Sequence, residues 1–465
     1  MGNEPESLFD LRAHDFGKDF IWGVSTAAYQ IEGAHDVDDK GPSIWDHFVS
    51  KKGKIHKGQH GRVACDFYHR YREDILLMKA MNIGHFRFSI SWARLLPDGV
   101  GNVSEPGIAF YDRVIDFCLE CGITPWITLY HWDLPRALED RGGWTNRDIL
   151  GWFEAYTRLC ADRFGDRVKH WMVLNEPMVF TGAGYFLGVH APGRKGLGNF
   201  LPTVHHAVLC QALGGRVLRD AIPEASIGTT FSCSQITPYS QSPKNLRAAK
   251  KADALLNRLF IEPSLGLGYP VESLSVLKRL EKYRRPGDLE DCIFDFDFIG
   301  VQNYTREVVR HSYTVPYLHA KIVSARKRNV RATLMDWEVY PPGIYAIIAK
   351  FNAYEKVKRV LVTENGAAFE DRLQNGKIAD FDRIEYLQKY LQQIRRAQSD
   401  GLKVSGYFVW TLIDNFEWAE GYRPRFGLVH VDFKTQERTV KASGEWYRQF
   451  LGSDSFTCSH GIKQK

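Results

Sequence analysis

The chain has 465 residues, of which 44% are hydrophobic and 25% charged, as is typical of a water-soluble globular protein with a large core. Its net charge of +6 is small for this length, and the densest basic run, at 51–57, is typical of a solvated loop. No apolar run reaches the roughly 20 residues of a membrane span. These features exclude nucleic-acid and membrane partners, and the length fits one large α/β barrel or two or three ordinary domains.

The N-terminus and the cysteines bear on the compartment. The first ten residues, MGNEPESLFD, lack the basic and apolar regions of a secretory signal. The eight cysteines are scattered singly, apart from Cys118 and Cys121, which stand one turn apart on a predicted helix that Gly122 ends. We interpret this pair as facing the core, with a redox or zinc pair as the alternative. A reduced, cytoplasmic protein is therefore expected.

Eight apolar runs that end in polar or aromatic residues follow one another along the chain. Most of them are rich in Val, Ile, Phe and Thr, as buried parallel strands are. The runs occupy residues 20–30, 85–92, 124–132, 170–176, 225–232, 297–304, 359–366 and 404–418. The first and the last are longer than ordinary barrel strands.

Helical patterns lie between these runs. The segment 147–165 places its apolar side chains on one face, with Thr145 or Asn146 as the N-cap, and 381–396 has a similar stripe. Strands that alternate with helices in this way predict a single (β/α)8 TIM barrel with elaborated βα loops. The expected division is an N-terminal extension at 1–19, a barrel domain at 20–450 and a flexible tail at 451–465.

Two of the runs end in a carboxylate. Glu176 ends the fourth run in WMVLNEP, and Glu364 lies at the end of the seventh in VLVTENG. A charge that leaves water costs several kcal/mol unless it is paired or protonated. Each carboxylate alone could simply cap the next element. Because the C-terminal ends of barrel strands carry the active site, the recurrence favours two carboxylates that project into one mouth.

The motifs around these carboxylates resemble those of glycoside hydrolase family 1. They are NEP at 175–177, TENG at 363–366, WTLIDNFEW at 410–418, FIWGVSTAAYQIEG at 20–33, HFRFSISW at 85–92, YHWDLP at 130–135 and GYRPRFGLVHVDF at 421–433. They arrive in the family's order and spacing, so the domain at 20–450 is identified as the family's catalytic domain. The resemblance implies a (β/α)8 barrel that hydrolyses β-glycosides with retention and uses neither a metal nor an organic cofactor.

The resemblance also implies chemical roles. Glycoside cleavage needs two carboxyls in different protonation states, one to protonate the leaving oxygen and one to attack the anomeric carbon. The match to NEP makes Glu176 the general acid and then the general base, and the match to TENG makes Glu364 the nucleophile. Arg87 and Tyr304 are expected against the nucleophile, where they favour its charged form, while the charge of Glu364 keeps Glu176 protonated. The alternative for Arg87 is a salt bridge without a catalytic role.

Sugar hydroxyls need donors and acceptors, and the family match supplies them. Asn175 is expected on the 2-hydroxyl, where contacts strengthen in the transition state. Gln30 and Glu417 are expected on the 4-hydroxyl. His131 and Trp418 are expected on the 3-hydroxyl. The other implied binding residues are Trp132 beside His131, Trp410 under the sugar ring, Phe426 beside the site, Trp337 on the aglycone side, and Gln302.

Some positions depart from the family pattern. Gln302-Asn303-Tyr304 stands where many members have Asn-Tyr-Tyr, which changes a polar contact near the nucleophile. A glutamine is long enough to reach the position of the first Asn. The other departures are Val173-Leu174 in place of Thr and an apolar residue, Thr411 for a frequent Ser, and Asp336 for a frequent Gly.

These residues together predict a retaining β-glycosidase for terminal non-reducing β-D-glucosides, and also for β-galactosides and β-fucosides. Small-molecule β-glycosides or cello-oligosaccharides are the expected substrates, which suggests a part in cellulose degradation. A 6-phospho-β-glycosidase is a weaker alternative, because Glu417 would repel a dianionic phosphate. An inactive barrel that serves as a scaffold is weaker still, because such members have lost one catalytic Glu and both are present here.

Overall fold

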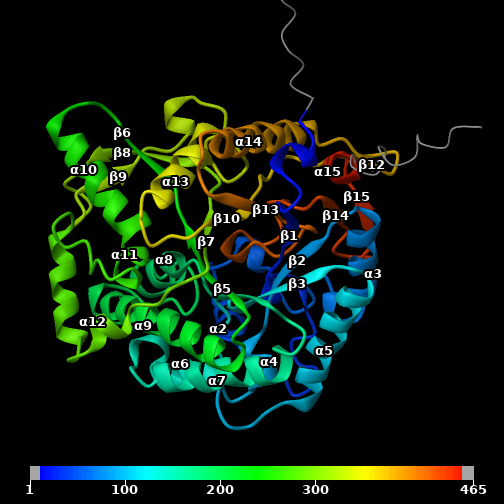
Figure 1. The fold of residues 1–465 in the computed structure, drawn as a ribbon, viewed down its shortest axis with the longest axis horizontal. Helices are drawn as coiled ribbons and strands as arrows, with labels where there is room; N and C mark the ends of the chain where they lie inside the picture. Colours follow the sequence, from blue (N-terminus) through cyan, green and yellow to red (C-terminus); the bar gives the residue numbers. More distant parts are fainter. Residues whose placement is uncertain (1–10, 453–465) are drawn as a thin grey trace, which may run out of the picture.

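Each of the eight predicted runs contributes one strand to a closed parallel barrel (Figure 1). The structure is a computed structural model that describes residues 11–452. The barrel strands are β1 (Ile21–Ser25), β2 (His85–Ser89), β3 (Thr124–Tyr130), β4 (His170–Asn175), β5 (Ser226–Ser232), β7 (Phe298–Gln302), β10 (Val360–Asn365) and β13 (Val404–Trp410). They neighbour one another in chain order, and β13 closes on β1. The (β/α)8 barrel prediction is therefore confirmed.

The two long runs are strands over only part of their length. The last register pair between β1 and β13 is Ser25 with Trp410, and both segments leave the barrel there. Beyond this point the first run turns into the short helix α1 (Ala28–Ile31). The last run becomes a loop that leads into η8 (Trp418–Glu420). Both extensions therefore stand over the C-terminal end of the barrel.

Large side chains fill the barrel below this end. A buried layer is formed by Trp126, Met172, Phe298, Leu361 and Phe408. Each of these residues lies on its strand before the C-terminal end. Glycines leave room for these rings: a Cβ on Gly228 would lie 2.3 Å from Phe298, and one on Gly23 would lie 2.5 Å from Phe408. The barrel interior is thus a packed core, and a cavity can open only at the C-terminal strand ends.

Helices surround the barrel and connect its strands (Figure 1). The longer ones are α3 (Phe67–Ala80), α5 (Glu105–Glu120), α7 (Ile149–Phe164), α9 (Leu197–Ala221), α10 (Pro243–Asp253), α13 (Pro342–Asn352), α14 (Phe381–Ser399) and α15 (Ala442–Gly452). The short α-helices are α2 (Ile44–Phe48), α4 (Trp92–Leu95), α6 (Arg136–Asp140), α8 (Pro177–Val179), α11 (Ile261–Ser264) and α12 (Asp288–Asp291). The other short helices are η1 (Ala13–Phe16), η2 (His56–Gly58), η3 (Gly143–Thr145), η4 (Phe180–Leu187), η5 (Ala254–Arg258), η6 (Ser275–Tyr283) and η7 (Arg326–Arg328).

The apolar stripe predicted for the helix after the third strand is buried in α7, but the predicted N-cap is wrong. The N-cap is Asp148, whose side chain caps nothing. Asn146 instead accepts a hydrogen bond from the Asp148 backbone N–H at 3.0 Å, in the turn before the helix. Cys118 is buried at the end of α5, and Cys121, the C-cap of that helix, is half-buried. All seven cysteines of the described part of the chain are free thiols.

The βα loops carry structure of their own. After β5 and β7 the chain forms a three-stranded sheet of β6 (Gln235–Pro238), β8 (Arg306–His311) and β9 (Ala320–Ile322). Helix α10 packs on this sheet (Figure 1). Two small hairpins pair β11 (Leu373–Gln374) with β12 (Lys377–Ile378), and β14 (Val429–Val431) with β15 (Arg438–Val440). Strand β8 starts just beyond the end of β7, so it can carry side chains to the barrel mouth.

The described ends of the chain pack against each other. Phe16 of η1 is buried, and its ring meets those of Trp22 and Phe450 edge-on, with centroids 4.9 and 6.4 Å away. Residues 1–10 of the proposed extension and residues 453–465 of the proposed flexible tail lie outside the described residues. Among residues 11–452, no helix is both long and apolar enough to cross a membrane.

A buried ion cluster braces the loop after β13. Asp414 accepts hydrogen bonds from Lys441 at 2.7 Å, from Arg425 at 2.7 Å and from the Gly427 backbone at 2.9 Å. Lys441 also pairs with Asp371. Burial alone would raise the pKa of Asp414, but the charges of Lys441 and Arg425 outweigh burial and hold it below its ordinary value. The loop that carries Glu417 and Trp418 is thereby fixed to the C-terminal segment.

Replacing Lys441 with Met is expected to lower the free energy of unfolding by about 3–5 kcal/mol, because two carboxylates then stay buried without this cation. The matched control is Lys389→Met on α14, whose pair with Glu385 is partly exposed to solvent and is expected to contribute about 0.3–0.5 kcal/mol. Chemical denaturation of both variants measures the difference. Equal losses would show that the buried cluster does not stabilise the fold.

Candidate active site

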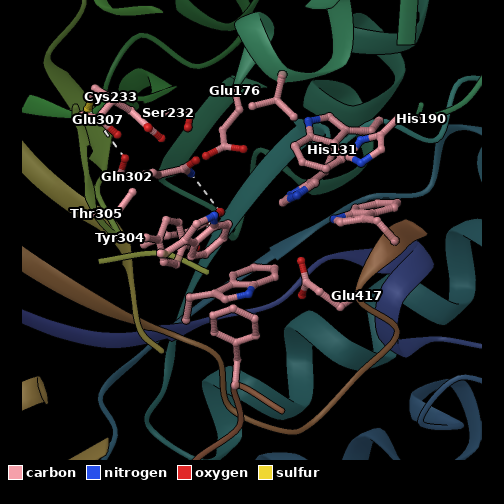
Figure 2. Close-up of a pocket in the computed structure, with 18 residues that line it drawn as sticks. His131, Glu176, His190, Ser232, Cys233, Gln302, Tyr304, Thr305, Glu307 and Glu417 are labelled. Carbon is pink, nitrogen blue, oxygen red and sulfur yellow. Dashed lines mark hydrogen bonds between the residues drawn. The ribbon is translucent and has the colours of Figure 1, made fainter. Parts of the chain in front are cut away.

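Glu176 and Glu364 line one pocket at the C-terminal end of the barrel. Figure 2 shows Glu176 among the side chains of this pocket. Glu176 has the left-handed backbone φ of +46°, which turns the chain out of β4, and Pro177 then starts α8. Its backbone N–H still donates to the Thr230 carbonyl at 3.0 Å. Glu364 stands within β10, next to its last residue. Both side chains are buried, which brings together two carboxyls 188 residues apart in sequence (364 − 176).

Three donors hold the carboxylate of Glu364. The wholly buried guanidinium of Arg87 pairs with Oε1. The Tyr304 hydroxyl donates to Oε2 at 2.7 Å, and the Gln302 side-chain amide donates to Oε1 at 2.8 Å. Gln302 therefore reaches the carboxylate, although it replaces the family's Asn. Its own amide oxygen is buried without a hydrogen-bond partner in the described structure.

The two carboxyls differ in what surrounds them. Burial raises the pKa of Glu176 well above its ordinary value, and the negative charge of Glu364 raises it further. Burial also raises the pKa of Glu364, but Arg87 and Tyr304 oppose this rise. The two carboxyls interact strongly, so they bind protons as a pair. The first proton goes to Glu176, because Glu364 has the cation Arg87 and the donors Tyr304 and Gln302 to stabilise its charge. The contacts with Arg87 and Tyr304 are those expected from the sequence, and burial of Glu364 acts against them.

Asn175 connects this pair to the other side of the pocket. Its amide oxygen accepts from Arg87, from the Thr230 hydroxyl at 3.0 Å and from the Gln302 amide at 2.8 Å. Its amide nitrogen lies 3.0 Å from Nε2 of His131. Burial lowers the pKa of His131 well below its ordinary value, and the charge of Arg87 adds to this. The imidazole is therefore neutral, and its Nε2 accepts the proton of Asn175.

Gln30 and Glu417 lie together at one end of the pocket. The amide nitrogen of Gln30 donates to the Asn415 side chain at 3.0 Å, the Phe416 carbonyl at 2.9 Å and Glu417 at 3.4 Å. The amide oxygen of Gln30 is buried without a partner in residues 11–452. Burial and the charge of Glu364 raise the pKa of Glu417 to about 8. This end of the pocket thus offers an unused acceptor and a carboxyl that holds a proton at neutral pH.

Aromatic rings wall the pocket. Trp418 contacts Trp132 and His131, with ring centroids 4.6 and 6.0 Å away. On another side, the Trp337 ring lies 5.1 Å from that of Tyr304 and 6.1 Å from that of Phe426. Trp410 belongs to this second group. Stacking surfaces of this kind suit the flat faces of sugar rings.

The structure brings every residue named from the sequence to this pocket or to the layer directly beneath it. It also adds residues that the sequence analysis missed. Thr230 and Asn415 are hydrogen-bonded to the named residues, and the lining further includes Val179, His190, Ser232, Cys233, Ser234, Thr305 and Glu307. Thr230 and Ser232 could have been found from the strand-end rule, since they close the fifth run. Within residues 11–452, no group of three or more His, Cys, Asp or Glu side chains could hold a metal ion.

Cleavage of a glycosidic bond needs a proton donor and a nucleophile in the same pocket. A protonated Glu176 beside an ionised Glu364 meets this need. The class defined by the fold and the pocket is that of a barrel glycosidase. Comparison with known proteins agrees with this class. The family model of glycosyl hydrolase family 1 matches residues 12–456. The chain belongs to glycosyl hydrolase family 1.

Individual relatives match along nearly their full length. A 1,4-beta-D-glucan glucohydrolase of Thermotoga neapolitana is 42% identical, over 95% of this chain and 99% of that protein. Beta-glucosidase A of Acetivibrio thermocellus is also 42% identical, over 95% and 99% of the two chains. The structure of a family 1 b-glucosidase from Thermotoga maritima superposes with a TM-score of 0.91 at 40% identity, covering 96% of this chain and 99% of that one.

Replacing Gln302 with Ala is expected to reduce kcat/KM for an aryl β-glucoside by about 10- to 100-fold, the equivalent of one hydrogen bond to a charged group at about 1.5–3 kcal/mol. The loss should be far smaller than that of Glu364→Ala. Gln302→Asn, which restores the common family residue, is the control and should recover part of the activity. Circular dichroism and Tm establish whether each variant folds. An unfolded Gln302→Ala protein would make Gln302 a structural part of the barrel instead.

Proposed function

We propose that the protein is a retaining β-glucosidase that removes terminal non-reducing β-D-glucosyl units, and also accepts β-galactosides and β-fucosides. The observation that carries the proposal is the unequal environment of Glu176 and Glu364. Membership of glycosyl hydrolase family 1 supports it, as do relatives named glucan glucohydrolase and beta-glucosidase. Small-molecule β-glycosides and cello-oligosaccharides are the proposed substrates, with cellulose degradation as the setting.

In the first step Glu364 attacks the anomeric carbon. Its electron pair forms the new carbon–oxygen bond while the glycosidic bond breaks, and the proton of Glu176 moves to the departing oxygen. The alcohol leaves, and a glycosyl ester remains on Glu364. Arg87 and Tyr304, which donate to the carboxylate, keep it anionic for the attack and orient it.

In the second step Glu176 changes its role. Once Glu364 is a neutral ester, the repulsion that raised the pKa of Glu176 is gone, and the residue stays behind as a carboxylate. It takes a proton from water, whose oxygen attacks the anomeric carbon and releases Glu364. Two inversions give net retention, with the proton returned to Glu176. The pocket needs no other group for this proton balance.

The remaining residues recognise the sugar. The unpartnered amide oxygen of Gln30 and the protonated carboxyl of Glu417 form an acceptor and donor pair for the 4-hydroxyl. Both side chains can pair with an axial or an equatorial hydroxyl, which is why galactosides are included. We assign Asn175 to the 2-hydroxyl, and His131 and Trp418 to the 3-hydroxyl. Trp410 provides the platform under the ring.

The residues that line the described part of the pocket disfavour binding of a 6-phosphorylated sugar. They include no Lys or Arg that could pair with a phosphate dianion. The carboxyl of Glu417 instead occupies the end of the pocket where Gln30 lies. We also propose a reducing, cytoplasmic location, which the seven free cysteines in residues 11–452 support.

Replacing Glu176 with Gln is expected to slow substrates according to their leaving group. An aryl β-glucoside with a good leaving group needs little proton help and should keep most of its glycosylation rate. Cellobiose should lose about 10²–10⁴-fold, the usual contribution of general acid–base catalysis. Deglycosylation should be slow for every substrate, because Gln cannot deprotonate water. A burst of aglycone and a mass increase of one hexosyl unit measure the trapped intermediate.

The pH profile provides the control for this variant. The basic limb of kcat/KM in the wild-type enzyme reports the acid of the free enzyme, and it should vanish in Glu176→Gln. Equal losses for both kinds of substrate, with no burst and an unchanged profile, would contradict the role of Glu176. That result would leave Glu176 as a residue that only caps the turn into α8.

A further inference from the structure

Glu307 is a carboxylate in the pocket wall that the mechanism above does not use. It stands on β8 and lines the pocket together with Ser232, Cys233 and Ser234. Its side chain makes no hydrogen bond and no ion pair with any residue in 11–452, although it is partly buried. Desolvating a carboxyl without a partner is unfavourable, so an unpaired one inside a pocket points to a ligand.

Two arginines near Glu307, Arg306 and Arg328, pair with another carboxylate. Arg306, the preceding residue, pairs with both oxygens of Glu338 at 2.8 and 2.9 Å. Arg328 donates to Glu338 at 2.6 Å and to the Val323 carbonyl at 3.1 Å. Arg328 influences Glu307 only through its charge. The local ion network is therefore complete without Glu307.

The place of Glu307 in the pocket indicates which part of a substrate it meets. Figure 2 shows Glu307 and Cys233 at one end and Glu417 at the other, with Glu176 between them. Under the proposed function, on which this inference rests, the cleaved sugar lies towards Glu417 and Glu176 protonates the departing oxygen. The leaving group then extends past Glu176 towards Glu307. The cavity has a volume of about 210 Å³.

The chemistry of Glu307 distinguishes among leaving groups. An apolar aryl group would cover the carboxyl without pairing with it, which is unfavourable. An ammonium group would need the ionised form. Burial raises the pKa of Glu307 to about 7, so both forms are present near neutrality. A hydroxyl group donates to the carboxylate and also accepts from the protonated acid, so it pairs with either form.

We propose that Glu307 is a specificity-determining residue that binds the hydroxyl groups of a sugar leaving group, and so favours β-linked di- and oligosaccharides over aryl glucosides. Trp337 lines the same pocket and offers its ring to the apolar face of that second sugar. The proposal extends the site from the cleaved glucosyl unit to the unit that departs.

The test compares substrates that share the glucosyl unit and differ in the leaving group. The ratio of kcat/KM for cellobiose to kcat/KM for p-nitrophenyl β-glucoside is expected to fall about tenfold in Glu307→Ala, and by less in Glu307→Gln, whose amide still pairs with hydroxyls. Glu355→Ala, an exposed glutamate outside the pocket, is the matched control and should leave the ratio unchanged. Thermal unfolding shows that the variants are folded.

A second readout uses the covalent intermediate. With p-nitrophenyl β-glucoside as donor and added cellobiose as acceptor, transfer to the acceptor competes with transfer to water. Glu307→Ala should reduce the share of transfer products several-fold. An unchanged ratio and an unchanged share of transfer would overturn the assignment of Glu307. A wild-type protein that cleaves neither substrate would instead refute the proposed function itself.

Discussion

The buried contact between Arg87 and Glu364 is the interaction on which the rest of the site depends. Arg87 is wholly buried on β2, and its guanidinium is shared between Glu364 on β10 and Asn175 on β4. A buried pair of charges is stable only when further hydrogen bonds complete it. Tyr304 and Gln302 provide these bonds. The same contacts oppose protonation of Glu364, so the first proton that the pair binds goes to Glu176.

The contact between Arg87 and Glu364 lies between a packed barrel interior below it and chain extensions above it. Below the site the interior is filled by rings such as Trp126 and Phe408, which exclude water from beneath the charges. Above it, the extensions of the first and last strands bring Gln30 and Glu417 over the mouth. The Asp414 cluster fixes the second extension. Two buried polar networks, one around Arg87 and one around Asp414, therefore hold the residues at the mouth of the barrel in place.

The barrel and the two strand-end carboxylates could be predicted from the sequence because they follow local rules, whereas the other residues of the site were implied by the resemblance to the family's motifs. Eight apolar runs alternate with helical stripes, and strand-end residues such as Glu176 and Glu364 share one mouth whatever their separation in the chain. Other features depend on distant neighbours. Three such features are the contact of Gln302 with Glu364, the unpartnered oxygen of Gln30 and the lack of a partner for Glu307. They depend on how segments far apart in the chain pack together, which the periodicity of the sequence does not reveal. The N-cap of α7 was missed because Asn146 serves the preceding turn.

The most direct test of the account is the stereochemistry of the reaction that azide restores to Glu364→Ala. The variant should hydrolyse no β-glucoside, because the group that attacks the anomeric carbon is gone. Azide, which is small enough to enter the space left by the carboxylate, should restore turnover of an activated β-glucoside and yield the α-glucosyl azide. Nuclear magnetic resonance identifies the anomer. A variant that keeps a tenth of the wild-type kcat, or a β-glucosyl azide as the product, would contradict the assignment of Glu364 as the nucleophile.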